Sequence, residues 1–434
     1  MLIKRIKDFT IRFRFKESFV RQVVTLMTGT ALAQGIAMVT IPVLSRLYHP
    51  ENFGILSIFM GIASIITVWA ALRYELAIVI PEKQEDATAL VKLSFSIAII
   101  MSFLSFIVII ALGHRIVTLF DLPYMDPWLK YLPLSIISAG FYNILYYWCT
   151  RNKRFDKISI SRVFQAIATV FGQLVAYALF KAGVGGLIAG YILGQMSGVG
   201  ILWAQLKGVR FWNPVFSFLR TKVATTYSDF PKYSGSGAFF DTAAAQIPLI
   251  AIPILFSPHI GGLYAFADRL LRVPAGLVGA SVSQVFYQRL AQAKRDRNER
   301  KRLIFSTWKY LFLLGIGPML VVFLFGPNIF AFFLGAHWRV AGQYAQILSI
   351  GFMAHFIAYP TSLGIVALER LDILFGWQVL NFLSMITVFS LGYLFFPNNI
   401  FSFLWIWSCK ELVIYILYMI ALWNAHSHGK IEPH

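Results

Sequence analysis

The sequence predicts an all-α polytopic membrane protein with about 12 transmembrane helices in two six-helix lobes. Three observations lead to this prediction. Of the 434 residues, 58% are hydrophobic and only 13% are charged, whereas a soluble domain carries about 25% charged residues. Apolar runs long enough to cross a bilayer recur along the whole chain, and basic residues gather in every second gap between them. Little chain is left over to build a soluble active site.

The predicted spans follow from the length that a helix needs to cross a bilayer, which is about 20 apolar residues. Twelve runs meet this requirement. They lie at roughly 23–45, 54–72, 91–113, 128–148, 161–181, 185–205, 235–256, 262–286, 307–326, 343–366, 373–396 and 402–423.

Basic residues set the predicted topology, because cytoplasmic loops of membrane proteins are enriched in Lys and Arg. The net charge is +19, from 38 Lys and Arg and 19 Asp and Glu. Most basic residues fall at the N-terminus, in the even-numbered gaps and in the tail; the exceptions on the opposite side are Arg46, Arg115, Lys130, Lys181 and Arg339. Both termini are therefore expected in the cytoplasm, and the basic pI reflects topology rather than nucleic-acid binding.

Breaker residues divide the predicted spans into two equal sets. The predicted order is a basic cytoplasmic N-terminal segment (1–22), an N-lobe of six helices (23–205), a cytoplasmic linker (206–234), a C-lobe of six helices (235–424) and a cytoplasmic tail (425–434). The linker carries Pro214 and Pro231, which interrupt helices.

The two predicted lobes show a weak internal repeat. Ala33-Gln34, Ile41-Pro42-Val43-Leu44 and Phe53-Gly54 are echoed by Ala245-Gln246, Ile252-Pro253-Ile254-Leu255 and Gly262. With six spans each, the lobes enter the membrane in the same orientation, as in the parallel repeats of many transporters. Chance similarity between apolar, Pro-containing helices is the alternative.

Charged residues inside the predicted spans are the main functional candidates, because a charge at mid-bilayer costs about 2.5–3.5 kcal/mol on insertion scales. The eighth span contains Asp268, Arg269 and Arg272, and the spacing of Asp268 and Arg272 places both on one helix face, with the acid first, the favourable order. The other candidates are Asp241 in the seventh span, Lys410 and Glu411 in the twelfth, and Tyr142 and Asn143 in the fourth.

Two interpretations of these residues remain open. In the first, the charges form neutralised structural pairs or reach toward an interface. In the second, Arg269 and Arg272 help to line a cationic cavity that binds a pyrophosphate, for which guanidinium groups are suited. Asp241 or Glu75 would then bind a coupling cation or proton, although Glu75 and Arg73 could equally form a structural ion pair.

Motifs for catalysis or for holding a metal or cofactor are not found. The sequence has no Gly-rich phosphate loop and no His-Glu-x-x-His, and its two cysteines have no metal-ligand spacing. No cofactor is expected.

Several short motifs, in order along nearly the whole chain, resemble the Wzx-type polysaccharide repeat-unit flippases of O-antigen and capsule synthesis. This family belongs to the multidrug/oligosaccharidyl-lipid/polysaccharide exporter superfamily. The motifs are Ser45-Arg46-Leu47-Tyr48-His49-Pro50-Glu51-Asn52-Phe53-Gly54, Leu72-Arg73-Tyr74-Glu75-Leu76-Ala77-Ile78, Tyr227-Ser-Asp-Phe-Pro-Lys-Tyr, Gly262-Leu-Tyr-Ala-Phe-Ala-Asp-Arg-Leu-Leu-Arg-Val-Pro, Gln284-Val-Phe, Phe325-Gly326, Leu334-Gly335 and Trp338-Arg339-Val340-Ala341-Gly342.

The resemblance implies two six-helix lobes around a central cavity that opens alternately to each side of the bacterial inner membrane. It implies a cargo of undecaprenyl-pyrophosphate-linked oligosaccharide, and the family's cavity is generally cationic. In this sequence the basic residues available for such a cavity are Arg269, Arg272 and Lys410, with Arg46 at a rim. Expected partners are membrane lipid and the polymerase and chain-length regulator of the same pathway.

Two other functions are weighed against this one. A cation-coupled small-molecule or drug antiporter of the same superfamily would use in-span carboxylates such as Asp241 and Asp268. An integral-membrane polymerase or ligase would usually carry its catalytic residues on a long outer loop, and here the outer loops are short. We therefore expect a transporter rather than an enzyme.

Overall fold

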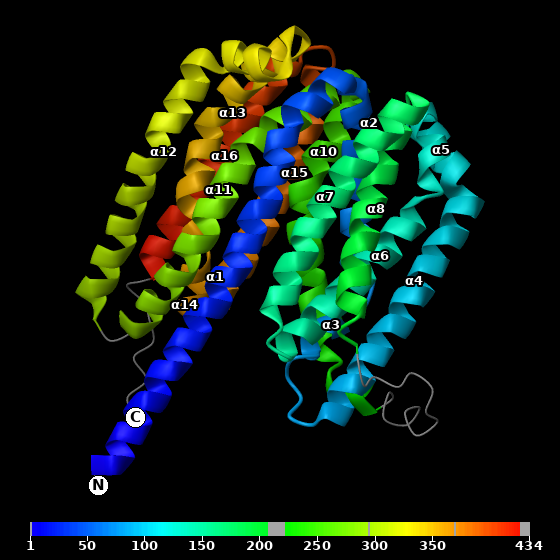
Figure 1. The fold of residues 1–434 in the computed structure, drawn as a ribbon. Coiled ribbons are helices and arrows are strands. Elements are labelled where there is room, and N and C mark those ends of the chain that lie inside the picture. Colours follow the sequence, from blue (N-terminus) through cyan, green and yellow to red (C-terminus); the bar gives the residue numbers. More distant parts are fainter. Residues whose placement is uncertain (1, 207–221, 294–295, 369, 426–434) are drawn as a thin grey trace. The chain divides into compact units, whose positions relative to one another are not determined.

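The computed structural model describes residues 2–206, 222–293, 296–368 and 370–425 (Figure 1). All regular structure in these ranges is helical, which confirms the predicted fold class. Every predicted span overlaps a long helix of the described chain. Ten helical stretches are long and apolar enough to cross a membrane. Of the two further long helices, α6 carries polar residues along its length, and α11 also carries charged ones.

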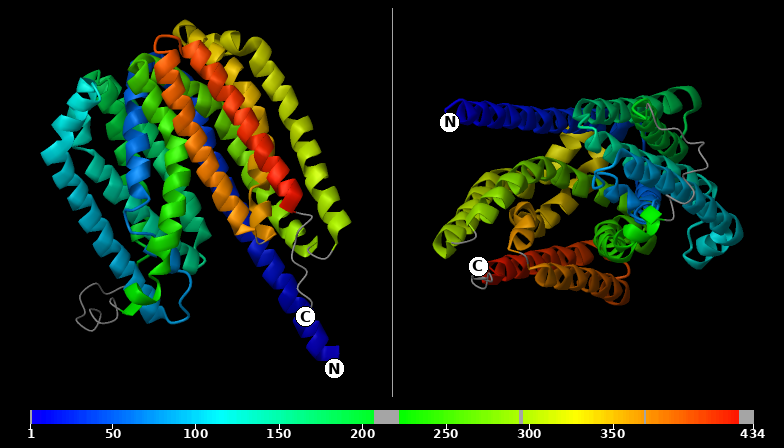
Figure 2. Two further views of the ribbon diagram at one scale, coloured as in Figure 1. Left: turned by 180° about the vertical axis from the view of Figure 1, so that it is seen from behind. Right: turned by 90° about the horizontal axis from the view of Figure 1, so that it is seen from below.

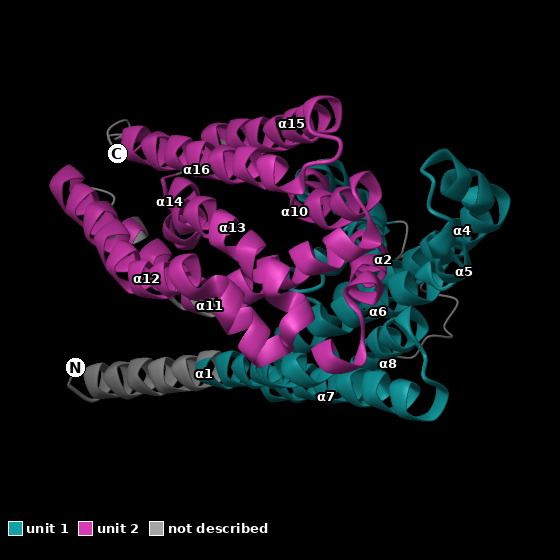
Figure 3. Ribbon diagram, turned by 90° about the horizontal axis from the view of Figure 1, so that it is seen from above, with its two compact units in different colours: residues 1–44, 62–238 teal, residues 45–61, 239–434 magenta. Residues whose placement is uncertain are grey.

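The described residues form two compact units, shown in separate colours in Figure 3. Unit 1 comprises residues 1–44 and 62–238, and unit 2 comprises residues 45–61 and 239–434. The segment 45–61 thus belongs to unit 2 although the chain on both sides of it belongs to unit 1.

Unit 1 contains most of α1 (Leu2–Leu47) and the end of α2 (Pro50–Thr67). It continues with α3 (Tyr74–Ala77), α4 (Gln84–Leu119), η1 (Pro123–Met125), α5 (Asp126–Leu129), α6 (Leu132–Arg151), α7 (Phe155–Phe180), α8 (Val184–Trp203) and η2 (Phe230–Ser234). Helices α7 and α8 pack closely along their length, because a Cβ atom on Gly190 would lie 2.5 Å from the Gln173 side chain.

After the segment 45–61, unit 2 continues with α10 (Gly235–Leu255, mostly in this unit) and α11 (Pro258–Gln292). It continues with α12 (Arg297–Leu334), η4 (Ala336–Trp338), α13 (Arg339–Ala358), η5 (Tyr359–Thr361), α14 (Leu363–Ala367), α15 (Leu371–Phe395) and α16 (Ile400–Ala425). Helices α15 (orange) and α16 (red) run side by side in Figure 2, and α16 also packs on α13.

Two helix ends differ from the predicted spans for identifiable reasons. The second span was expected to reach residue 72, but α2 ends at Thr67. Turns follow, and Leu72 and Arg73 adopt left-handed backbone angles (φ 49° and 65°) that cannot continue a helix. The tenth span is broken after Ala358 by η5, which contains Pro360 and lacks that residue's amide donor.

The segment 45–61 is held on unit 2 by a backbone-to-backbone helix crossing. A Cβ atom on Gly54 would collide with the carbonyl of Pro258, and one on Gly262 would collide with the carbonyl of Pro50. The side chain of Trp338 is fully buried, and its Nε1 donates to the carbonyl of Ser45 at 2.9 Å. Phe53 packs edge-on against Phe266, with 4.5 Å between ring centroids.

Candidate functional site

The centre of α11 carries the predicted Asp268–Arg272 pair. The N-terminus of α11 is stabilised by Ser257, which caps the helix by accepting a hydrogen bond from the Ile260 amide. One turn separates Asp268 from Arg272, and Arg272 Nε donates to Asp268 Oδ1 at 2.6 Å. The guanidinium also lies over the ring of Phe352, 5.9 Å from its centroid. The helix period therefore supplies Arg272 with its counter-ion.

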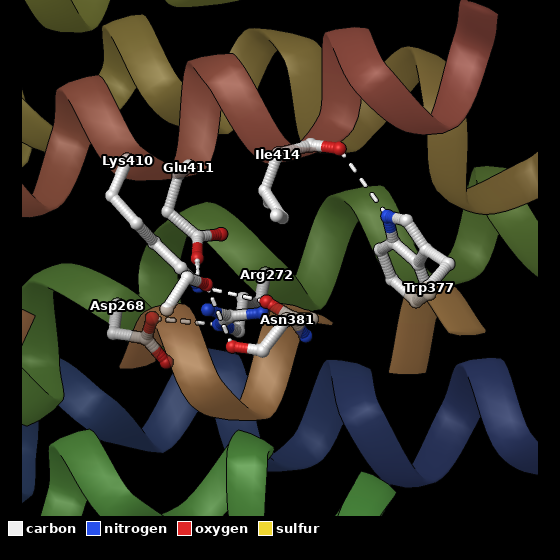
Figure 4. A network of polar contacts seen from close by, with 8 residues as sticks. Asp268, Arg272, Trp377, Asn381, Lys410, Glu411 and Ile414 are labelled. Atoms are coloured by element: carbon white, nitrogen blue, oxygen red, sulfur yellow. Dashed lines mark hydrogen bonds and ion pairs between the residues drawn. The ribbon is translucent and has the colours of Figure 1, made fainter. Parts of the chain in front are cut away.

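A second ion pair lies on α16. Lys410 Nζ donates to Glu411 Oε1 at 2.9 Å and to Asn381 Oδ1 of α15 at 2.8 Å. It also lies 4.9 Å from the centroid of the Trp407 ring. Both side chains of the pair are buried, with 6% and 11% of their surface exposed. Figure 4 shows this group beside Asp268 and Arg272.

Close packing of α16 on α13 fixes the position of Glu411. Ser408 Oγ donates to the carbonyl of Ile347 at 2.7 Å and accepts from the amide of Gly351 at 2.9 Å. A Cβ atom on Gly351 would lie 2.9 Å from the Cβ atom of Glu411. A larger residue at position 351 would therefore push Glu411 away from α13.

These charged groups border a cavity of about 490 Å³ within unit 2, a size typical of small-ligand sites. Its charged and amide lining residues come from five long helices, and η5 and α14 add Tyr359 and Ser362. The polar lining residues include Asp241 of α10, Arg272 of α11, His355 of α13, Gln378 and Asn381 of α15 and Glu411 of α16. The structure thus brings together three predicted site residues, Asp241, Arg272 and Glu411, and places Asp268 and Lys410 beside them through their ion pairs.

Aromatic rings form another part of the lining. The His355 ring stacks on Tyr359, with 5.3 Å between centroids and 18° between planes, and meets Tyr415 edge-on at 4.8 Å. Trp377 lies 5.8 Å from Tyr415 and 5.2 Å from Tyr418. Its Nε1 donates to the carbonyl of Ile414 at 3.2 Å, which anchors the indole of α15 to α16.

These aromatic residues and the amides beside them were not among the site residues predicted from the sequence. A usable signal was present, because Trp377 and Asn381 are one turn apart and Glu411, Tyr415 and Tyr418 share one helix face. Such a polar and aromatic stripe within an apolar run indicates a face turned toward a cavity.

The remaining predicted basic residues of unit 2 lie outside this cavity lining. Arg269 and Arg46 are both exposed. Arg269 has no hydrogen-bond or ion-pair partner among the described residues, and it follows Asp268 directly, so it projects in another direction from α11.

The predicted residues Arg73, Glu75, Tyr142 and Asn143 belong to unit 1. Arg73 Nη1 lies 3.8 Å from Glu75 Oε1, and the second oxygen of Glu75, Oε2, is buried without a hydrogen-bond partner. Burial raises the pKa of the Glu75 carboxyl, against the lowering effects of a backbone hydrogen bond and of Arg73. The Tyr142 hydroxyl is 3.3 Å from Ser161 Oγ, and Asn143 is half-buried.

Comparison with known proteins identifies the family. Residues 43–343 match the model of a family described as polysaccharide biosynthesis protein. The chain belongs to this family. The resemblance to polysaccharide flippases that the motifs indicated is thereby confirmed at the level of the family.

A curated relative and several solved structures extend this match. The succinoglycan biosynthesis transport protein ExoT of Rhizobium meliloti (strain 1021) is 23% identical over 363 residues, which cover 82% of this chain and 69% of that protein. An inward-facing multidrug resistance MATE family transporter of the MOP superfamily superposes with a TM-score of 0.69 at 13% identity, covering 92% of this chain and 94% of that one. The lipid II flippase MurJ in an inward closed conformation superposes with a TM-score of 0.68 at 14% identity, covering 92% of this chain and 87% of that one. The structural matches establish a shared fold.

Proposed function

We propose that this protein carries undecaprenyl-pyrophosphate-linked oligosaccharide repeat units from the cytoplasmic to the outer leaflet of a bacterial inner membrane by alternating access. The observation that carries the proposal is the cavity of unit 2, which is lined by charged, amide and aromatic side chains, and four of its five long helices are apolar enough to span a bilayer. Family membership and the relative named as a succinoglycan transport protein support the same function.

A polar passage is what this reaction needs. An oligosaccharide cannot cross hydrocarbon unaided, because each unpaired polar group costs several kcal/mol to bury. Polar groups in the cavity would replace water around the sugars, while the polyprenyl tail stays in the lipid. The protein would thus lower a transfer barrier without breaking a bond, so no catalytic group is required.

Alternating access needs a source of energy, and we propose an ion gradient or the membrane potential, which is worth about 2.3 kcal/mol per charge per 100 mV. Candidate coupling or gating groups are Asp241, Asp268 and Glu411 in unit 2 and Arg73 and Glu75 in unit 1. Both termini are proposed to face the cytoplasm, and a polymerase and a chain-length regulator would act on the delivered units.

The direct test is reconstitution. Purified protein is placed in liposomes with a fluorescent undecaprenyl-pyrophosphate-linked oligosaccharide, and the fraction accessible to an external membrane-impermeant quencher is followed over time. We expect the protected half of the probe to become accessible only in liposomes that contain the protein. Accessibility equal to that of protein-free liposomes, under both an imposed pH gradient and an imposed potential, would exclude flipping.

A second candidate is a cation-coupled drug antiporter, which the carboxylates of Asp241 and Glu411 in an aromatic-lined cavity favour. Ethidium efflux from cells that express the protein distinguishes the two. A flippase leaves the rate of efflux equal to that of the vector control, whereas an antiporter increases it.

A further inference from the structure

We infer that the cavity of unit 2 is a binding site for an uncharged sugar ring of the cargo, and that the pyrophosphate is bound elsewhere. This inference rests on the proposed function and assigns one part of the substrate to one site. It follows from the balance of charge in the cavity, from its free hydrogen-bonding groups and from its aromatic wall.

The first step is the charge balance. The cations nearest the cavity are already paired, since Arg272 Nε bonds Asp268 at 2.6 Å and Lys410 bonds Glu411 at 2.9 Å. Asp241 has no hydrogen-bond or ion-pair partner among the described residues. The local set therefore carries one carboxylate more than it has cations. A pyrophosphate would approach a set of groups whose net charge is negative, which is electrostatically unfavourable.

The second step is the supply of hydrogen bonds. Besides Asp241, the lining offers the amide of Gln378, which is half-buried. It also offers His355, whose Nδ1 is buried without a partner. A carboxylate accepts only, an amide both donates and accepts, and a neutral imidazole does both. Sugar hydroxyls also donate and accept, so they can satisfy this mixed set.

The third step is the shape of the wall. Trp377 and Tyr415 both line the cavity, with 5.8 Å between their ring centroids and 47° between their planes. The hydrogen bond of Trp377 to Ile414 holds the indole in place. A rigid aromatic surface beside hydrogen-bonding groups contacts the apolar C–H face of a pyranose while the hydroxyls meet the polar side chains. The cavity volume of about 490 Å³ is sufficient for a small ligand and too small for a long oligosaccharide.

The fourth step is the placement of the pyrophosphate. Arg269 lies on the same helix, is exposed and is unpaired among the described residues. It can therefore offer a complete guanidinium fork to a phosphate. A sugar in the cavity and a phosphate at Arg269 would engage neighbouring parts of one cargo molecule.

The test uses the full-length protein in lipid nanodiscs and saturation-transfer NMR with three soluble probes. These are methyl glycosides of common neutral hexoses and N-acetylhexosamines, geranyl pyrophosphate as a sugar-free phosphate, and tetraphenylphosphonium as an organic cation. We expect glycoside signals that neither geranyl pyrophosphate nor tetraphenylphosphonium reduces by competition. Absence of glycoside signals in the wild type, or their displacement by either charged probe, would overturn the inference.

Substitutions locate the site. Trp377→Leu should weaken glycoside binding about threefold to tenfold through loss of the aromatic face, whereas Trp377→Phe should retain most of it. Asp241→Asn should weaken it about tenfold. The matched control is Trp308→Leu, because Trp308 is a half-buried indole of the same unit that donates to Thr361 Oγ1 and is not part of the cavity lining. Equal loss in Trp377→Leu and Trp308→Leu would show a structural effect and contradict the assignment.

The outcomes separate this inference from the proposed function. Flipping in liposomes without glycoside binding would leave the transporter in place and remove the sugar site from unit 2. Glycoside binding in the cavity without any flipping would keep the site and reject the transport function. Arg269→Ala should reduce the binding of geranyl pyrophosphate and leave glycoside binding unchanged; the opposite pattern would reverse the two assignments.

Discussion

Lys410 and Glu411 are the most strongly buried ion pair of the cavity region, so removing one partner is expected to be costly. Lys410→Met would leave the Glu411 carboxylate unpaired in a site where it is 11% exposed. Breaking such a pair typically costs about 3–5 kcal/mol. We expect Lys410→Met to lower the free energy of unfolding by about this amount, measured by thermal or denaturant unfolding in detergent.

The double variant Lys410→Met/Glu411→Gln is the control for that prediction. It removes both charges and leaves a neutral amide at position 411, so most of the lost stability should return. If the double variant is as unstable as the single one, packing around position 410 rather than unpaired charge accounts for the loss.

Glu75 gives a pH-dependent prediction in unit 1. It lies in α3, outside the helices that are apolar enough to span a membrane, and burial raises its pKa in the folded state. The folded protein then binds the proton more tightly than the unfolded chain does. The contribution of Glu75 to stability therefore falls as the pH rises from its unfolded pKa through its raised folded pKa.

Glu75→Gln removes this titration while keeping the shape of the side chain. We expect the variant to have a higher melting temperature than the wild type at neutral pH and a smaller difference from it at pH 4–5, in scans taken at matched ionic strength. A variant that is less stable at neutral pH would mean that the Arg73–Glu75 pair outweighs the cost of burying the carboxylate.

For individual residues, the sequence predicts contacts within one helix better than contacts between helices. Asp268 and Arg272 could be paired because a fixed helix period places them on one face. The bond from Lys410 to Asn381 joins two helices and depends on how α15 and α16 pack, which the spacing within either helix does not determine. The cavity could not be predicted from the sequence for the same reason, because its lining residues come from several helices that meet only in the folded protein.

Close crossings between helices depend on the identity of the residue at the point of contact. The crossing of α2 and α11 requires glycine at positions 54 and 262, because a Cβ atom at either would meet a backbone carbonyl that cannot turn aside. Gly54→Val should therefore separate the two helices and cost about 1–3 kcal/mol or more. The readout is the melting temperature and the yield of monodisperse protein.

Gly376→Ala is the matched control for this crossing. Gly376 lies inside α15 in the same unit, and nothing lies within 4 Å of a Cβ atom built there. Replacing it by alanine should be neutral or should stabilise the helix by up to about 1 kcal/mol. Similar losses in Gly54→Val and Gly376→Ala would refute a special role for the crossing.

The presence of each long helix could be predicted from the sequence, whereas the residues at which some helices end could not. Long apolar runs require helices in a membrane, since no other open structure satisfies the backbone. After Thr67 the chain continues in turns, with hydrogen bonds from Trp69 N to Ile66 O and from Ala70 N to Thr67 O. It then reaches left-handed angles at Leu72 and Arg73, a conformation that neither residue type predicts. The break before α14 had a visible signal in Pro360, which the apolar run around it obscured.

On the scale of the whole molecule, family and fold class were predictable because motif order and hydropathy extend over the entire chain. The division into units was less accessible. Residues 45–61 fall in the predicted N-lobe by sequence order, yet they pack with unit 2 through Gly54 and the bond from Trp338 to Ser45. Long-range packing of this kind is hard to predict, because in the sequence it is marked only by isolated glycine and tryptophan residues.

The last prediction concerns transport and the segment 45–61. The chain leaves unit 1 after Leu44 and returns to it at Ile62. The alternating access proposed above would move one unit against the other, and that motion would either release this segment from unit 2 or bend the chain at its two ends. Glu51 and His259 hold it at its start, with 2.6 Å between Oε1 and Nδ1, and both side chains are about half-exposed and open to reagents. We expect release, because the segment is also the start of α2, a helix that continues into unit 1.

The experiment cross-links the double variant Glu51→Cys/His259→Cys with a short reducible bifunctional thiol reagent, in a background with the exposed Cys409 replaced by serine. We expect the cross-linked protein to lose flipping in liposomes and to recover it after reduction. The single variants Glu51→Cys and His259→Cys should be unaffected by the reagent. Full flipping by the cross-linked protein would show that the segment stays on unit 2 throughout the cycle, with bending confined to the residues around Leu44 and Ile62.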